Sequence, residues 1–162
     1  MEGATPAYLL LGTNLGRREE FLSLAKEAIG EKAGRIVAES SVYQTEPWGT
    51  EGQPLYLNQA LILETRLSPG DLLREVLQIE TALGRVRDGH WGNRTIDIDI
   101  LYYGSLVMND GELEIPHPRL HLRNFALYPL NEIAPDYIHP VLKKSNRLLL
   151  TESSDPLPVH KW

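Results

Sequence analysis

The sequence contains no cysteine among its 162 residues. A disulfide framework and a thiolate metal cluster are therefore excluded. The chain also lacks an apolar run long enough to span a membrane, and its first residues lack the basic region of a secretory signal. We expect a cytoplasmic protein that makes no membrane contact.

Positive charge is also in short supply. The chain has 16 lysines and arginines against 22 aspartates and glutamates, a formal net charge of −6. Such a chain has no general attraction for nucleic acid, so any polyanion it binds must meet local positive charge. No G-x-x-x-x-G-K-[ST] pattern occurs, which excludes the common phosphate-binding loop.

The length fits one domain, and the sequence shows neither an internal repeat nor a low-complexity linker. We expect a single domain over residues 1–162, with a loosely held tail from about residue 151. Hydrophobic periodicity predicts strands and helices in the order βαββαβ. The predicted strands are residues 7–12, 35–45, 55–67 and 95–103, the helices are residues 13–34 and 68–84, and a hairpin follows at 106–109 and 112–115.

This order is typical of an α+β protein with a ferredoxin-like α/β sandwich, in which two helices cover one face of a mainly antiparallel sheet. Residues 116–140 predict short helical pieces interrupted by prolines, which form a helical C-terminal extension. In the second strand, alternation places Ile36, Ala38, Ser40 and Val42 on one face. The helix at 68–84 begins with Ser68 as its N-cap.

Two aspartates interrupt a strand of β-branched residues at 95–103. Asp97 and Asp99 are two residues apart, so their side chains leave the same face, with Cα atoms roughly 6.5 to 7 Å apart. Two like charges on one face repel unless a cation or solvent relieves them. The pair therefore indicates either a metal site or a solvated outer face, and the spacing alone does not decide between them.

Arginines gather around this acidic pair in an otherwise acidic protein. Arg85, Arg87 and Arg94 flank it, and a phosphorylated ligand with magnesium would satisfy both signs of charge. The alternative for each arginine is a surface ion pair, above all for Arg87 beside Asp88. Glu80 stands at the border of the apolar stripe of its helix. Its carboxylate either has a role at this site or simply extends past the stripe into solvent.

Two segments, residues 45–55 and 87–94, combine glycines with a tryptophan in polar sequence. Trp48 and Trp91 indicate two mobile lids beside the aspartates, or else tryptophans that pack on the body while glycines serve the turns.

Several stretches together resemble one family. They are GRVRDGHWGNRTIDIDIL, LLLGTNLG, SSVYQTEPWG, YLNQAL, IETALGRVR and IPHPRLHLRNFALYPLNEIAPD. The first resembles the signature of the 6-hydroxymethyl-7,8-dihydropterin pyrophosphokinases, and the others occur in that family's order up to about residue 140. The resemblance implies a ferredoxin-like monomer that transfers pyrophosphate from ATP to the hydroxymethyl group of the pterin, in folate biosynthesis, releasing AMP.

The resemblance also implies a role for each matching residue. Asp97 and Asp99 would bridge two Mg²⁺ ions, and Arg85 and Arg94 would bind ATP phosphates. Further nucleotide contacts would come from Glu80, Arg87, Trp91, Ile100, His117 and Arg123. The pterin would be held by Tyr56 and Phe125 on its two faces, by Asn58 through hydrogen bonds, and by Thr45, Pro47 and Trp48 along the wall.

The residues themselves leave other interpretations open. Tyr56 and Phe125 are also ordinary core aromatics, and His117 between two prolines is also an ordinary turn residue. A two-metal phosphohydrolase or nuclease would use the same aspartates and arginines, although the acidic balance argues against a nucleic-acid substrate. A non-catalytic pterin- or nucleotide-binding module is a third hypothesis, and metal-independent binding would distinguish it.

Overall fold

The computed structural model describes residues 3–14, 16–45, 55–85 and 96–162. In chain order the elements are β1 (Thr5–Thr13), α1 (Arg18–Lys32), β2 (Arg35–Glu39), β3 (Tyr43–Thr45), β4 (Tyr56–Thr65), α2 (Pro69–Arg85), β5 (Asp97–Tyr103), β6 (Met108–Asn109), β7 (Glu114–Ile115), η1 (Leu120–Leu122), α3 (Asn124–Ile133), α4 (Asn146–Glu152) and β8 (Val159–Lys161).

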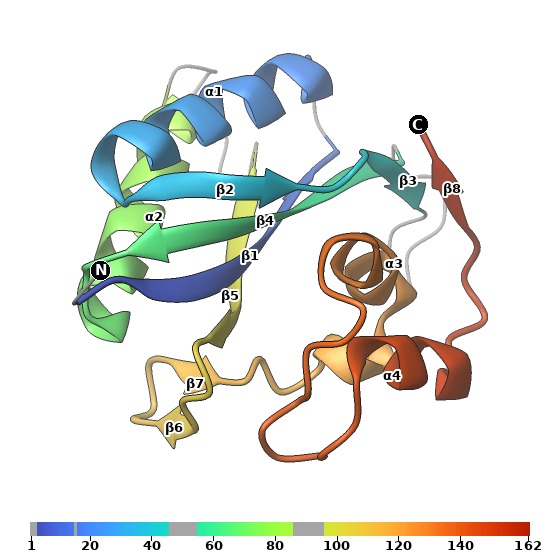
Figure 1. Cartoon of the computed structure of the whole chain (residues 1–162). Helices are drawn as coiled ribbons and strands as arrows, with labels where there is room; N and C mark the ends of the chain where they lie inside the picture. The colour runs from blue at the N-terminus through green and yellow to red at the C-terminus, as the bar shows by residue number, and fades with distance from the viewer. Residues whose placement is uncertain (1–2, 15, 46–54, 86–95) are drawn as a thin grey trace.

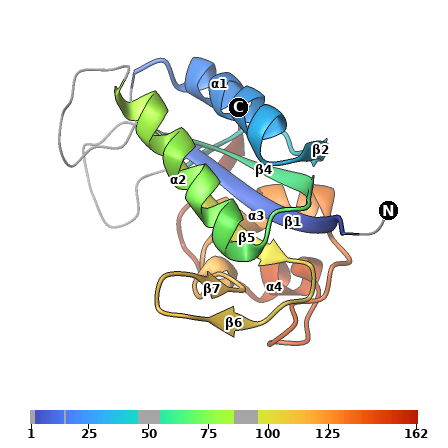
Figure 2. The same cartoon turned by 90° about the vertical axis from the view of Figure 1, so that its left-hand side faces the viewer.

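The main sheet has the order β5-β1-β4-β3-β8, and β2 also pairs with β4. Its strand pairs within the described residues are all antiparallel. Strands β5, β1, β4 and β2 with helices α1 and α2 form the predicted βαββαβ unit, which confirms the α+β ferredoxin-like fold. Figures 1 and 2 show α1 and α2 on one side of this sheet and α3 and α4 on the other.

Alternation along the strands gives the sheet two apolar faces. Leu9 and Leu11 of β1 point to one face, where they pack with Ile29 of α1 and Val76 of α2. Leu10 points to the opposite face and packs with residues of α3 and α4. Both faces are covered, so a polar side chain on either face lies within the fold unless it sits near a strand end.

The start of α2 and the end of α1 follow the predicted signals, whereas α1 begins at Arg18 and not at residue 13, because Thr13 still belongs to β1. Ser68 Oγ accepts a hydrogen bond from Asp71 N at 3.2 Å, and α2 begins at Pro69 directly after this cap. Gly34 follows α1 because a Cβ there would lie 2.3 Å from the backbone oxygen of Glu64. The backbone of β4 thus comes too close for any other residue at this position.

The predicted strand over residues 35–45 is corrected by the structure, which has two strands, β2 and β3. The interruption falls at Ser40, whose Oγ donates to Ser41 O at 2.7 Å and accepts from Ala60 N at 2.9 Å. These side-chain bonds, one to the next residue and one to β4, accompany the break between β2 and β3. The alternating pattern continues across the break, and so the pattern alone suggested one strand.

The segment from Thr151 onward, expected to be loosely held, contains the end of α4 and then β8. Thr45 of β3 lies opposite Val159, and Tyr43 lies opposite Lys161. Trp162 N also donates to Val42 O at 2.8 Å. The last residues therefore extend the sheet beyond β3, a pairing that three residues of sequence do not indicate.

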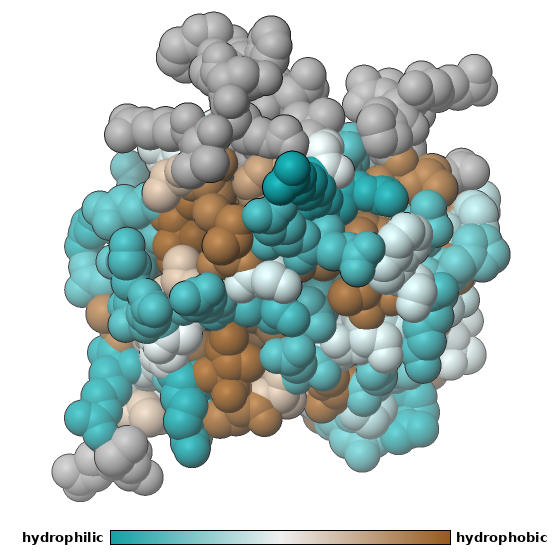
Figure 3. Space-filling view, turned by 90° about the horizontal axis from the view of Figure 1, so that it is seen from above, coloured by the Kyte–Doolittle hydropathy of each residue, from teal (hydrophilic) through white to brown (hydrophobic). Residues whose placement is uncertain are grey.

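The surface seen from above mixes hydrophilic and hydrophobic residues (Figure 3). Apolar side chains that reach solvent include Leu24, Leu77, Val107 and Val141. Among the described helices, none is both long enough and apolar enough to cross a bilayer.

Candidate active site

The two aspartates of β5 lie on the face of the sheet that α3 covers. Asp97 is opposite Gly12 of β1, and Asp99 is opposite Leu10, whose side chain belongs to the core beneath α3 and α4. Both aspartates are half-buried, whereas Ile98 is buried on the other face. The carboxylates therefore share one face near the end of an edge strand, as the two-residue spacing predicts.

Glu80 reaches the same strand from α2. Its Oε2 accepts a hydrogen bond at 2.6 Å from the backbone N–H of Ile98, the residue between the two aspartates. No group of three or more His, Cys, Asp or Glu side chains in the described residues is placed to hold a metal ion. A cation here would need oxygen ligands from its substrate and from water, which is the usual way that Mg²⁺ binds.

A buried amide lies two strands away from Asp97. Asn58 of β4 is 3% exposed, and its Nδ2 donates to Thr45 Oγ1 of β3 at 2.8 Å. This bond holds the amide in place, with Nδ2 toward Thr45. The amide oxygen then faces Gly12, where a Cβ would lie only 3.0 Å away.

Gly12 is a site residue that the sequence analysis did not select. It lies opposite Asn58 on one side and opposite Asp97 on the other. A side chain here would occupy the space between the amide and the carboxylate. The available signal was a glycine at the end of an apolar strand, which often marks a place where another group approaches the backbone.

Tyr56 is the first residue of β4 and is partly exposed on the same face as Asn58. Burial raises the pKa of its hydroxyl, and the negative charge of Asp97 adds to this effect. The ring therefore remains an uncharged apolar surface at neutral pH, close enough to Asp97 for that charge to affect the pKa of its hydroxyl.

A second group of predicted residues comes from the chain between β7 and α3. The guanidinium carbon of Arg123 lies 5.4 Å from the centre of the Phe125 ring. Burial lowers the pKa of Arg123, and Asp99 opposes this shift. Arg123 thus brings a positive charge, stacked on an aromatic ring, to the second aspartate.

His117 is tied to β5 through its backbone, since its N–H donates to Leu101 O at 3.0 Å. Its Nδ1 accepts from Arg119 N at 3.2 Å, which places the proton of the neutral ring on Nε2. Burial lowers the pKa of His117, and the charges of Arg123 and Arg119 lower it further. At neutral pH the ring is an uncharged hydrogen-bond donor.

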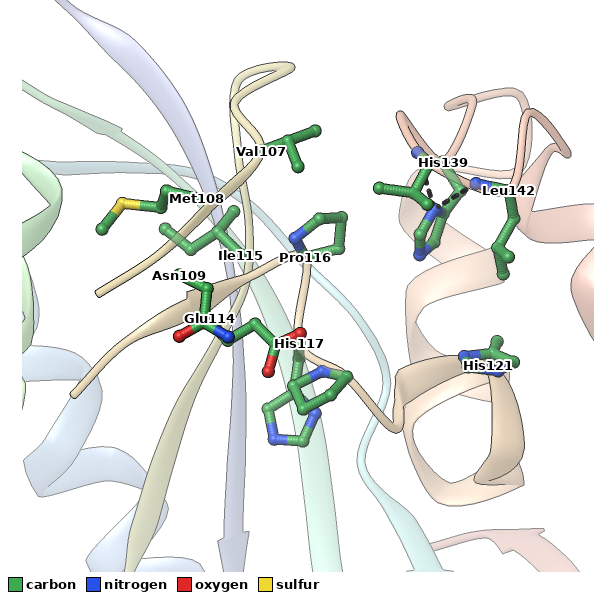
Figure 4. Close-up of a pocket in the computed structure, with 12 residues that line it drawn as sticks. Val107, Met108, Asn109, Glu114, Ile115, Pro116, His117, His121, His139 and Leu142 are labelled. Atoms are coloured by element: carbon green, nitrogen blue, oxygen red, sulfur yellow. Dashed lines mark hydrogen bonds between the residues drawn. The ribbon is translucent and has the colours of Figure 1, made fainter. Parts of the chain in front are cut away.

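A pocket of about 450 Å³ lies beside His117. Figure 4 shows it between the β6–β7 hairpin on one side and His121, His139 and Leu142 on the other. His139 Nδ1 accepts from the backbone N–H groups of Val141 and Leu142, and burial lowers the pKa of His139 to about 4. The pocket borders the site through His117, but neither aspartate lines it.

The remaining predicted residues are distributed as follows. Ile100 is 4% exposed and its side chain packs in the core with α1 and α2, so only its backbone can meet a ligand. Arg85 is the last residue of α2. Pro47, Trp48, Arg87, Trp91 and Arg94 lie outside the described residues.

Together these features define an α+β protein of the ferredoxin-like class with one composite site. A pair of carboxylates, a half-buried cation and an uncharged imidazole suit a phosphorylated ligand. A buried amide on the same strand face as Tyr56 suits a flat, hydrogen-bonding ring.

Comparison with known proteins identifies the family of this chain. The family model for 7,8-dihydro-6-hydroxymethylpterin-pyrophosphokinase (HPPK) matches residues 8–135. A 2-amino-4-hydroxy-6-hydroxymethyldihydropteridine pyrophosphokinase of Methylorubrum extorquens is 46% identical over 135 residues, which cover 83% of this chain and 85% of that protein. One of the same name from Haemophilus influenzae is 41% identical over 156 residues, covering 96% and 94%. The chain belongs to the HPPK family.

Solved structures agree on the fold. The HPPK-DHPS protein of Plasmodium falciparum with pteroate superposes with a TM-score of 0.71 at 18% identity, covering 92% of this chain. An HPPK-DHPS in complex with substrates gives a TM-score of 0.74 at 16% identity, covering 91%. The chain spans less than half of these two longer proteins, 42% and 43% respectively.

Proposed function

We propose that this protein transfers the β,γ-pyrophosphoryl group of ATP to 6-hydroxymethyl-7,8-dihydropterin, in folate biosynthesis. The products are the pterin diphosphate and AMP. Membership of the HPPK family supports this reaction. The structural observation that supports it is the row Asn58, Gly12 and Asp97, in which an amide and a carboxylate of neighbouring strands lie on either side of a residue without a side chain.

The pterin would lie over this row. Its ring would stack between Tyr56 and Phe125, since flat heteroaromatic rings favour stacking on aromatic side chains. The amide of Asn58, oriented by Thr45, would accept from the amino group of the ring through Oδ1 and donate through its second Nδ2 hydrogen. Thr45, Pro47 and Trp48 would line the wall beside it.

Mg²⁺ would be held by Asp97 and Asp99, two ions with the bound ATP. The donor set fits, because two half-buried carboxylates on one strand face leave coordination positions for phosphate oxygens and water. When bound, the metal would neutralise charge on the transferred and leaving phosphates. Glu80, through its bond to the backbone between the two aspartates, would fix the position of this part of β5.

The phosphates would also meet cations of the chain. Arg85, Arg94 and Arg123 would bind non-bridging oxygens, and His117 would donate from Nε2. Arg87, Trp91 and the backbone of Ile100 would complete the nucleotide contacts.

The reaction needs few chemical steps from the protein. The hydroxymethyl oxygen of the pterin attacks the β-phosphorus, the bond from that phosphorus to the bridging oxygen of the α-phosphate breaks, and AMP leaves with the bonding electrons. The hydroxyl proton is released to solvent, so we assign no obligate general base and no covalent enzyme intermediate. The chain acts mainly by positioning and by charge compensation.

We also propose that the chain works as a single domain and as a monomer in the cytoplasm. The two apolar cores share one sheet, which supports a single cooperative unit. Nucleic acid and membranes have no part in this proposal.

The function is tested by incubating the purified protein with ATP, Mg²⁺ and the pterin, and by quantifying nucleotides and pterins by mass spectrometry. Equimolar AMP and pterin diphosphate, both lost on chelation of the metal, are the expected result. ADP, or phosphate released without pterin, would instead indicate a phosphohydrolase. Pterin binding without any product would indicate a binding module.

A further inference from the structure

Arg18, the first residue of α1, joins three separate parts of the chain. Its Nη1 donates to the backbone oxygen of Leu55 at 2.6 Å. Its guanidinium carbon also lies 5.2 Å from the centre of the Trp162 ring. Figure 1 shows the start of α1, β3 and β8 near the same end of the molecule. One cation thus holds the beginning of β4 and the end of β8 together.

Leu55 precedes a residue proposed to bind the pterin, and Trp162 follows the strand that pairs with another. Leu55 directly precedes Tyr56, and Tyr56 lies opposite Thr45 in the sheet. On the other side of β3, Thr45 lies opposite Val159 of β8. The position of Thr45, which bonds the amide of Asn58, therefore depends on the short strands β3 and β8 and on the contacts that order them.

These strands have little intrinsic stability. β3 and β8 have three residues each, and β8 forms the edge of the sheet. Isolated strand pairs of this length are marginal in water, so contacts outside the ladder decide how well they are ordered. A charge-assisted hydrogen bond and a cation–π contact from one guanidinium are contacts of this kind.

The neighbouring residue Arg17 offers a contrast. Its side chain is 82% exposed and pairs with Glu20 in the first turn of the same helix. Arg17 and Arg18 carry the same charge and are adjacent in the sequence. A general electrostatic effect would involve both residues, whereas the contacts with Leu55 and Trp162 belong to Arg18.

We infer that Arg18 is a positioning residue for pterin recognition, acting through Leu55 on Tyr56 and through Trp162 on β8 and Thr45. This inference rests on the proposed function, because it assumes that Tyr56, Asn58 and Thr45 form the pterin site. It predicts a selective effect: loss of Arg18 weakens pterin binding and leaves ATP binding unchanged. It also predicts that substitutions of Arg18 and Trp162 have non-additive effects on pterin binding.

The test compares Arg18→Met with the matched control Arg17→Met, which removes the same charge one residue away. For Arg18→Met we expect the KM for the pterin to rise by about fivefold to tenfold, the range for loss of one typical hydrogen bond at an exposed site. The KM for ATP, kcat at saturation and Tm should stay close to wild type. Arg17→Met should match wild type in every value.

Two further variants separate positioning from a loss of structure. Trp162→Ala should raise the pterin KM, while Trp162→Phe, which keeps an aromatic face, should restore most of the affinity. The double variant Arg18→Met with Trp162→Ala should be no worse than the stronger single variant, because both remove one shared contact. If Arg18→Met fails to fold, the two Trp162 variants still decide the question.

Equal pterin KM values for Arg18→Met and Arg17→Met would overturn the inference and leave the proposed function standing. A parallel rise in the KM for ATP would also overturn it, since a structural role would affect both substrates. If the wild-type protein makes no pterin diphosphate, the proposed function fails first. Fluorescence titration with the pterin then compares the same variants without turnover.

Discussion

Asn58 of β4 and Asp97 of β5 lie on opposite sides of Gly12, the residue of β1 that faces both of them. The absence of a side chain at Gly12 lets the Asn58 amide oxygen lie within 3.0 Å of where a Cβ would be. In the proposed reaction this position brings the ring-binding group and the metal-binding group within reach of one small substrate.

Gly12→Ala should therefore impair pterin binding. The added Cβ would lie 3.0 Å from Asn58 Oδ1 and would displace the amide from the position that Thr45 gives it. We expect the pterin KM to rise by about tenfold, an effect on the order of one buried hydrogen bond. Steady-state kinetics with each substrate varied in turn measures this.

Gly30→Ala in α1 is the control, because nothing lies within 4 Å of a Cβ there. Alanine at that helical position should stabilise the protein by roughly 0.5–1 kcal/mol without changing either KM. If Gly12→Ala bound the pterin as tightly as Gly30→Ala, the ring would not lie over Gly12.

Asp97→Asn should abolish transfer and keep the fold. The amide has nearly the same shape as the carboxylate but lacks the charge that would bind the metal, so kcat should fall by a factor on the order of 10² or more. Asp136→Asn, which alters an exposed aspartate paired with Arg147, serves as the control and should be fully active. A normal rate for Asp97→Asn, with a normal Tm, would show that Asp97 is not needed to bind the metal.

His117 should report on phosphate binding through its pKa. Burial, with the charges of Arg123 and Arg119, lowers the pKa below the usual value near 6.5, so the ring is neutral in the free protein. A bound polyphosphate adds negative charge and should raise the pKa. NMR titration of the imidazole with and without a non-hydrolysable ATP analogue measures the shift, and an unchanged pKa would place His117 away from the phosphates.

Glu132 should make the stability of β3 depend on pH. Its carboxylate accepts from Tyr43 Oη at 2.5 Å and from both N–H and O–H of Ser41 at 3.0 Å. Burial alone would raise the pKa of Glu132, but these hydrogen bonds outweigh it and hold the pKa below its usual value. The resulting stability is present above the unfolded pKa and is lost as pH falls through the folded pKa.

Glu132→Gln should therefore unfold at a lower temperature than wild type at pH 7, with a loss of about 1 kcal/mol. The difference should shrink as pH falls below the usual glutamate pKa of about 4.3 and through the lower pKa of Glu132 in the folded protein. Thermal unfolding across pH measures this, with Glu27→Gln as an exposed control. A difference that stayed constant from pH 7 to pH 3 would contradict the account.

Much of the fold could be predicted because local signals agree with it. The Ser68 cap and the apolar stripe of α2 are confirmed, as is the shared face of Asp97 and Asp99 in β5. The break at Ser40 and the pairing of β8 could not be predicted. Both depend on contacts with distant segments, Ala60 in one case and β3 in the other.

The site could likewise be predicted only in part. Because side chains alternate along a strand, the sequence predicts that Asp97 and Asp99 share a face. This alternation cannot predict that Gly12 pairs with both Asn58 and Asp97, because the register between strands depends on the whole sheet. Arg18 gave no signal in the sequence, since its partners are 37 residues away at Leu55 and near the end of the chain at Trp162.

The most direct test of the central claim follows the β-phosphorus. ATP radiolabelled at that position is incubated with the protein, Mg²⁺ and the pterin, and the products are separated by chromatography. Pyrophosphoryl transfer predicts that all label leaving ATP appears in the pterin diphosphate and that the AMP is unlabelled. Label remaining in ADP would contradict the account, because the bond to the α-phosphate would then have stayed intact.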